Sequence, residues 1–171
     1  MKWSLYILLI GLLVVAIGYN YYPEQALPAN TIIDSLQVNK SKHQLIAFNE
    51  GKPVKIYQVS FGDDPKGHKH FEGDEKTPEG LYIINAKNDQ SGYHKNLGIS
   101  YPDQDDVAYA QSAGKSAGGD IKIHGLRNGL GFINKFQRWF NWTNGCIALT
   151  NSEVDELYQA VKIGTKIEIK P

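Results

Sequence analysis

The sequence predicts a mainly β domain with a few short helices, preceded by one N-terminal hydrophobic helix. Ten tyrosines and 17 glycines among 171 residues favour strands and turns over a helical bundle. After residue 31, short β-rich runs alternate with polar turns. Before residue 23, in contrast, the chain is almost entirely apolar. These three observations together define the expected fold class.

The first 22 residues form one apolar segment, with no charge between Lys2 and Glu24. With its flanking aromatic residues, the run 5–17 approaches the ~20 residues that a membrane-spanning helix needs. Residues 1–22 are therefore expected to be a signal anchor, with a cleaved signal peptide as the alternative. Either one places the rest of the chain outside the cytoplasm, in the periplasm or cell envelope. Residues 23–31, with two prolines, are expected to link this segment to a domain over residues 32–171.

The domain is expected to begin with a meander of three strands. Polar turns separate the three β-rich runs, at residues 36–38, 44–48 and 54–61. A further strand is expected at residues 81–85, after a Thr-Pro-Glu-Gly turn. Alternating residues 166–169 are expected to form the last strand.

Two short helices are expected within the domain. Asp103 has the character of an N-cap for a helix reaching residue 112, with Val107 and Ala108 facing the core. The second helix is expected to follow Thr150, where a capping-box spacing precedes an apolar face. Gly164 is expected to end it.

The charge balance argues against one class of partner. The 18 basic and 18 acidic residues cancel, so the chain has no broad positive field with which to bind nucleic acid. We therefore expect no nucleic-acid partner.

Cys146 and His124 are the strongest candidates for catalytic residues, as a nucleophile and its base. Cys146 is the only cysteine, so it cannot form an intramolecular disulfide, and it follows Gly145 at the start of an apolar run. His124 closes a β-branched run. A thiol needs a base to become reactive, and imidazole is the usual one. The alternative is a buried cysteine that acts as a small hydrophobe and a histidine satisfied by the backbone.

Three motifs that follow one another along the chain favour the interpretation of Cys146 and His124 as a reactive pair. They are residues 72–82, with Gly-Asp and Thr-Pro-Glu-Gly-Leu-Tyr; residues 121–125, with His-Gly; and residues 143–149, Thr-Asn-Gly-Cys-Ile-Ala-Leu. Together they resemble the signature of the L,D-transpeptidase catalytic domain, the YkuD-like family. The resemblance covers most of residues 32–171 and implies a β-sandwich or barrel.

The resemblance implies an enzyme that acts on peptidoglycan stem peptides, without metal or cofactor. Cys146 would form a thioester with the stem and pass it to an amine acceptor, with His124 as the base. The backbone N–H groups of Gly145 and Cys146 would stabilise the oxyanion. The residues expected to bind substrate are Gly125, Thr143, Asn144 and Tyr101.

Two departures from the family pattern keep other activities open. Asn144 stands where many members have histidine, and Ala148 stands where many have arginine. The missing arginine puts the usual substrate in doubt, so an amidase or L,D-carboxypeptidase acting on the same bonds is a second hypothesis. A third is an inactive wall-binding module.

Two further patterns allow a functional and an ordinary interpretation. Aromatic residues recur at helical spacing over residues 132–140, here called the aromatic segment, and could pack in the core or form a lid beside Cys146. His68 and His70 have the spacing of metal ligands, but a zinc site needs two more, so solvated loop histidines are favoured.

Overall fold

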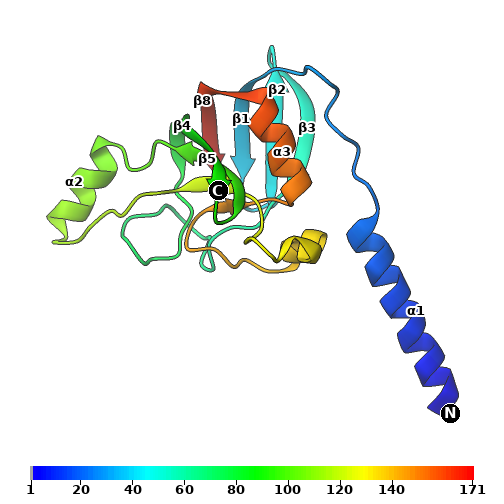
Figure 1. The fold of residues 1–171 in the computed structure, drawn as a ribbon. Coiled ribbons are helices and arrows are strands. Elements are labelled where there is room, and N and C mark those ends of the chain that lie inside the picture. The colour runs from blue at the N-terminus through cyan, green and yellow to red at the C-terminus, as the bar shows by residue number, and fades with distance from the viewer. Residues whose placement is uncertain (1) are drawn as a thin grey trace.

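The computed structural model describes residues 2–171 and contains one mixed β-sheet with three short helical segments, beside a long N-terminal helix (Figure 1). The strand order is β3-β2-β1-β8-β4-β5-β6-β7. The strands are β1 (Ile33–Asn39), β2 (Gln44–Asn49), β3 (Lys52–Gln58), β4 (Gly80–Ser91), β5 (His94–Ile99), β6 (Lys122–His124), β7 (Ile147–Ala148) and β8 (Val161–Lys170). The helices are α1 (Lys2–Tyr21), α2 (Gln104–Ser112), the 3-10 segment η1 (Gly131–Trp139) and α3 (Asn151–Ala160).

The sheet curves into a half-barrel because the long strand β4 belongs to both of its parts. The first residues of β4 pair with β8, and its later residues pair with β5 after a register shift at Ile84. Such an irregularity bends a strand and increases its twist. At the far edge, Ser60 forms a two-way backbone bridge to Ala148 in β7, at 3.1 and 2.8 Å. The chain that leaves β3 therefore meets β7, and the predicted β-barrel character is confirmed.

The core lies between the curved sheet and α3. In β1, Leu36 and Val38 are buried while their neighbours are more exposed, as expected for a strand with one face toward the core. Helix α3 adds Val154 and Leu157 to the same cluster. The predicted meander matches β1, β2 and β3, which pair in sequence order as antiparallel neighbours.

Helix α2 begins where the sequence predicts but turns a different face inward. Asp103 caps it in a reciprocal capping box with Asp106. The buried residues are Asp106 and Ala110, whereas Val107 and Ala108 are exposed, so the predicted inward face is wrong. The reason is polar: Asp106 is held inside by His68, whose Nε2 lies 2.7 Å from a carboxylate oxygen.

Helix α3 also begins as predicted, with Thr150 at the N-cap of a capping box. It ends at Ala160, so the prediction that Gly164 ends it is wrong. Val161 already pairs with Ile33 in β1, and Gly164 lies within β8 at a φ of 92°. Strand pairing thus ends the helix one turn earlier than the glycine would.

Helix α1 stands apart from the sheet and points away from the domain (Figure 1). Residues Trp3–Tyr21 have a mean hydropathy of 1.9, and almost all are exposed. By length and composition this helix could cross a membrane. Only its last turns touch the domain, on the 3-10 segment η1.

Candidate active site

The parallel pairing of β6 and β7 brings His124 and Cys146 to one cleft. Ile123 pairs with Ile147 and His124 with Ala148, so Cys146 lies level with Lys122. Alternate residues of a strand share a face, and so do residues level with each other on neighbouring strands. The side chains of Lys122, His124 and Cys146 therefore lie on one side of the sheet. The cleft there has a volume of about 360 Å³ and is lined by Ser91, Tyr93, Asn96, Gly119, Asp120, Ile121, Lys122, His124, Trp142, Thr143, Asn144 and Cys146.

His124 is buried and held by the backbone beside it. Its Nδ1 lies 2.6 Å from the carbonyl oxygen of Gly125. A carbonyl can only accept, so Nδ1 carries the proton and Nε2 presents a free lone pair. The ring also packs against Tyr93 and Trp142, with centroid distances of 4.8 and 5.7 Å. The imidazole is therefore fixed in position and tautomer without a carboxylate partner.

Gly125 can hold this position only because it lacks a side chain. A Cβ there would lie 2.8 Å from Oδ1 of Asn151 and 3.1 Å from Cβ of His94. That same Oδ1 accepts from the N–H of Leu126 at 2.9 Å and fixes the chain just after the histidine. The His-Gly pair of the sequence motif is thus explained by close packing.

Cys146 sits at the end of a tight turn that Thr143 closes. The Thr143 hydroxyl donates to the carbonyl oxygen of Cys146 at 2.8 Å and accepts from the N–H of Gly145 at 3.1 Å. Gly145 has a φ of 122°, which favours glycine. The thiol makes its hydrogen bond to the carbonyl oxygen of Asp120, 3.7 Å away.

The electrostatics of the cleft favour a neutral resting pair. Burial lowers the pKa of the His124 imidazole below its ordinary value, against the opposing hydrogen bond to Gly125. Burial also raises the pKa of the Cys146 thiol, although the backbone and ammonium group of Lys122 oppose it. Near neutral pH the site therefore holds a thiol and a neutral imidazole rather than a preformed ion pair.

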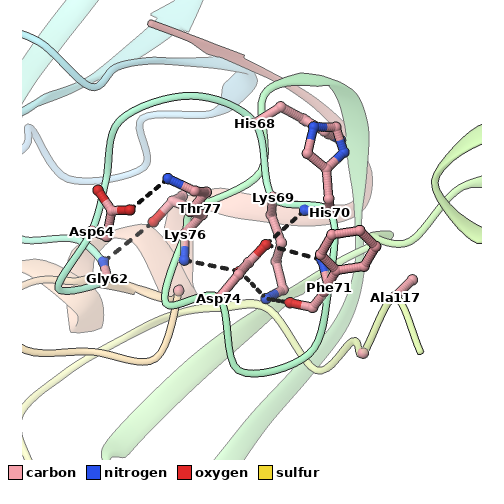
Figure 2. Close-up of polar contacts among 12 residues, drawn as sticks. Gly62, Asp64, His68, Lys69, His70, Phe71, Asp74, Lys76, Thr77 and Ala117 are labelled. Carbon is pink, nitrogen blue, oxygen red and sulfur yellow. Dashed lines mark hydrogen bonds and ion pairs between the residues drawn. The ribbon is translucent and has the colours of Figure 1, made fainter. Parts of the chain in front are cut away.

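The loop of residues 62–77, here called the site loop, packs behind the turn that carries Cys146, and Asp74 is its centre (Figure 2). One oxygen of Asp74 accepts from the N–H groups of His70 and Phe71, at 2.7 and 2.9 Å. The other accepts from Nζ of Lys69, at 2.8 Å, and from the N–H of Lys76, at 3.1 Å. Burial alone would raise the pKa of Asp74, but these hydrogen bonds hold it below its ordinary value.

The site loop touches the turn of residues 143–146, here called the cysteine turn, at two glycines. A Cβ on Gly145 would lie 2.5 Å from the carbonyl oxygen of Lys76. A Cβ on Gly62 would lie only 1.9 Å from the carbonyl oxygen of Glu75 and 3.0 Å from Cα of Gly145. Backbone therefore packs on backbone here, and the path of the site loop limits where Cys146 can sit.

The predicted site residues separate into two groups. Thr143 and Asn144 line the cleft with His124 and Cys146. Tyr101 does not: it is buried in the core, where its hydroxyl donates to the carbonyl oxygen of Ala117 at 3.0 Å. Its prediction as a substrate-binding residue is therefore wrong, because core packing uses both its ring and its hydroxyl. Gly125 lies behind the histidine rather than in the cleft.

Sequence reasoning missed several cleft residues. Trp142 stands directly before the nucleophile motif, so adjacency could have identified it. Asp120 and Lys122, which form a 2.6 Å ion pair just before and at the start of β6, gave no such signal because charged residues near strand ends are common. Of the two histidines with metal-ligand spacing, His68 pairs with Asp106 and His70 stacks on Tyr109, with ring centroids 4.3 Å apart. Among residues 2–171, no group of three or more His, Cys, Asp or Glu side chains is arranged to hold a metal ion.

The aromatic segment is not a lid. None of its residues lines the cleft. It packs instead on the end of α1, where the side chain of Asn20 donates to the carbonyl oxygen of Phe132 at 3.1 Å. The prediction of a cover over Cys146 is therefore wrong, because helical spacing of aromatic residues does not reveal which neighbour they meet.

Comparison with known proteins identifies the family. The family model of the L,D-transpeptidase catalytic domain (YkuD) matches residues 34–169. This match covers most of the chain, which belongs to the L,D-transpeptidase catalytic domain family. The resemblance inferred from the three motifs is thus confirmed at the level of the family.

Individual relatives agree with this assignment. The chain is 30% identical over 135 residues to YqjB of Bacillus subtilis (strain 168), which carries a provisional L,D-transpeptidase name; the match covers 77% of this chain and 68% of that protein. It is 31% identical over 109 residues to YafK of Escherichia coli (strain K12), also provisionally named an L,D-transpeptidase, covering 63% of this chain and 35% of that protein.

Solved structures show the same fold. Pgp2 of Campylobacter jejuni, described as a helical cell shape determining protein, superimposes with a TM-score of 0.60 and 26% identity, covering 83% of this chain and 49% of that one. An L,D-transpeptidase from Mycobacterium smegmatis gives a TM-score of 0.53 at 17% identity, covering 80% and 58%, which shows the fold alone. The chain spans about half the length of Pgp2.

Proposed function

We propose that this chain is an L,D-transpeptidase of the cell envelope that forms a thioester between Cys146 and a peptidoglycan stem peptide. It then transfers the acyl group to an amine acceptor. One observation carries the proposal: the only cysteine shares a cleft with a buried histidine whose Nδ1 proton is fixed on the Gly125 carbonyl. That arrangement leaves Nε2 as the base.

The proposed reaction has two balanced halves. As Sγ of Cys146 attacks the amide carbonyl carbon, Nε2 of His124 accepts the thiol proton. The C–N bond of the amide breaks, and the imidazolium returns that proton to the leaving amine. In the second half, the acceptor amine attacks the thioester and gives a proton to His124. The C–S bond then breaks, and the sulfur recovers a proton from the imidazolium.

The neutral resting pair sets the order of these events. With the thiol pKa raised and the imidazole pKa lowered, proton transfer accompanies the attack rather than preceding it. The proposed oxyanion donor is the N–H of Cys146. The N–H of Gly145, the other candidate, already donates to the Thr143 hydroxyl at 3.1 Å.

The cleft walls suit a peptide with both apolar and polar parts. Tyr93 and Trp142 stack with ring centroids 6.2 Å apart, and Asn96 and Asn144 supply amide groups nearby. We propose that these residues and Thr143 contact the stem peptide. We further propose that α1 is an uncleaved membrane anchor, which would hold the domain beside the wall; its length and hydropathy support this.

The direct test uses the two catalytic candidates on purified wall material. Cys146→Ala should abolish turnover. It should also abolish labelling by a carbapenem, a thiol-reactive β-lactam that the family resemblance suggests as a mimic of the acyl donor. His124→Ala should lower the rate by about 10²–10⁴-fold, the usual worth of a positioned acid–base group. A Cys146→Ala variant that processes muropeptides at the wild-type rate would show the covalent mechanism to be wrong.

Hydrolysis is the second candidate, and one observation favours it. Because the aromatic segment lies away from Cys146, no part of it shields a thioester from water. Asn144 and Ala148, which stand where many family members have histidine and arginine, also favour hydrolysis over transfer. Mass spectrometry of muropeptides, with an amine acceptor in large excess, separates the two. Cross-linked or amine-capped stems support transfer, hydrolysed stems alone support an amidase or carboxypeptidase, and unchanged stems support an inactive wall-binding module.

A further inference from the structure

The end of α1 is fastened to the aromatic segment through a buried asparagine. Asn20 is 1% exposed, although it lies at the end of an otherwise exposed helix. Its side chain donates to the carbonyl oxygen of Phe132 at 3.1 Å and accepts from the N–H of Phe136 at 3.2 Å. Its own carbonyl oxygen accepts from the side chain of Asn134 at 2.6 Å. All the hydrogen-bonding groups of Asn20 that face the domain are therefore used.

Charged groups extend this junction into the catalytic domain. Nζ of Lys135 donates to the carbonyl oxygen of Tyr22 at 2.6 Å and pairs with Glu24 at 2.9 Å. Arg138 pairs with Glu24 at 3.0 Å and with Glu153 at 2.8 Å. Glu153 belongs to the capping box of α3, so the anchor helix is connected to the core through a continuous set of polar contacts. The domain is therefore attached to α1 by these contacts as well as by the linker of residues 23–31.

The other face of the aromatic segment is largely exposed in the described part of the chain. Phe132 is 64% exposed, Trp139 57% and Phe140 67%, although the polar residues between them point inward. Tyr19 of α1 stacks on Trp139 with ring centroids 6.3 Å apart. The exposed aromatic face therefore lies directly beside the exposed apolar surface of α1. Large aromatic residues beside a membrane-crossing helix are typical of the interface between lipid and water.

The length of the helix brings this face to the bilayer. Residues 3–18, before the contacts with the domain begin, span about 24 Å at 1.5 Å per residue. The hydrocarbon core of a bilayer is about 30 Å thick. A helix that is shorter than this core is accommodated by local thinning of the bilayer, which brings the headgroups closer to the residues that flank the helix. Asn20 and the aromatic face attached to it are therefore drawn to the headgroup layer.

We infer that Phe132, Trp139 and Phe140 insert into the headgroup region of the bilayer that α1 crosses, and that Asn20 holds the domain in this orientation. The inference rests on the proposed anchoring by α1. It assigns the aromatic segment a lipid surface as its partner. The catalytic cleft is then carried at a fixed height and angle above the membrane.

Depth-dependent quenching in nanodiscs tests the inference on the full chain. In a Cys146→Ser background, a nitrobenzoxadiazole dye is attached to one new cysteine at a time: Phe132→Cys, Phe140→Cys, Val14→Cys or Ile163→Cys. Val14 reports the anchor. Ile163 is an equally exposed control in β8, a strand that begins on the side of the domain away from α1 (Figure 1). Phosphatidylethanolamine–phosphatidylglycerol nanodiscs carry the nitroxide either at the headgroup or deep in the acyl chain, and circular dichroism confirms folding.

The expected result is quenching at 132 and 140 by headgroup nitroxide, at least threefold stronger than at 163, with quenching at 14 by the deep nitroxide. Adding Asn20→Ala should reduce the quenching at 132 and 140 at least twofold without changing it at 14. Quenching at 132 and 140 no stronger than at 163, with 14 still quenched, overturns the docking and leaves the anchor intact. No quenching at 14 removes the anchor and the docking together. Quenching at 132 and 140 that is insensitive to Asn20→Ala overturns the fixed orientation.

Discussion

The site loop and the aromatic segment are both irregular, yet they handle polar and apolar groups in opposite ways. The site loop is rich in charge, and although most of that charge is exposed, it turns the Lys69–Asp74 ion pair inward. The aromatic segment is rich in large apolar side chains and turns three of them outward. The polar stretch thus supports the nucleophile from within, and the apolar stretch lies on the exterior.

This difference teaches that local hydrophobicity does not decide which segment is structural. A carboxylate with four hydrogen bonds organises a loop as firmly as a hydrophobic cluster does. Aromatic side chains, in turn, can be buried either in a protein core or, where a helix crosses a membrane next to them, in the lipid interface. The next experiments test each side of this comparison.

The largest expected effect follows from removing the charge at the centre of the site loop. Asp74→Asn leaves the ammonium group of Lys69, which is 3% exposed, without its counter-charge. Breaking such a buried pair costs about 3–5 kcal/mol of unfolding free energy. Urea unfolding of the full chain in detergent measures it. Asp64→Asn in the same loop is the matched control: that carboxylate is 58% exposed, so losing its pair with Lys76 should cost at most about 1 kcal/mol. Equal effects would refute the inward organisation of the loop.

A smaller effect is expected where the site loop packs against the cysteine turn. Gly62→Ala forces a Cβ against the carbonyl of Glu75, and overpacking of this kind costs about 1–3 kcal/mol. Because Gly145 lies directly behind, the rate of carbapenem acylation should fall about tenfold as Cys146 is displaced. Gly92→Ala is the control, since a Cβ there meets nothing within 4 Å. Normal acylation in Gly62→Ala would show that the loop does not position the thiol.

Acid should loosen the site loop in a way that depends on Asp74. Its pKa is lowered in the folded protein, so its stabilising contribution is complete above the unfolded value of about 3.9 and is lost as pH falls through the folded value. Amide exchange at His70, Phe71 and Lys76, corrected for the intrinsic pH dependence, should therefore accelerate below about pH 3.9. The Asp74→Asn variant should lack this acid step. A step of the same size in both would assign it to another group.

The smallest effect is expected from the aromatic segment in detergent. Phe140→Ser changes an exposed side chain, so the unfolding free energy should move by no more than about 0.5 kcal/mol. Acylation by a carbapenem should also be unchanged, because the segment does not line the cleft. A loss of several kcal/mol would mean that Phe140 packs inside the domain, and the contrast with the site loop would fail.

Short-range patterns predicted much of the fold and pointed to residues that the structure places in one cleft. The meander of β1 to β3 and both helix N-caps were readable because their signals lie within a few residues. Cys146 and His124 were found through motifs, and Thr143 lies beside them in the cleft. What failed depends on contacts between distant residues: Tyr101 is held by the carbonyl of Ala117, and the aromatic segment by α1. Nothing local in a sequence specifies such partners.

The place of β8 in the sheet has a consequence for the order in which the sheet can form. This strand, the last one in the described chain, lies between β1 and β4 and pairs with both. Before residues 161–170 are available, the meander of β1 to β3 can meet the part of the sheet that carries His124 and Cys146 only through the isolated bridges Ser60–Ala148 and Gly62–Thr143. The mixed sheet is therefore complete only once the last strand is in place.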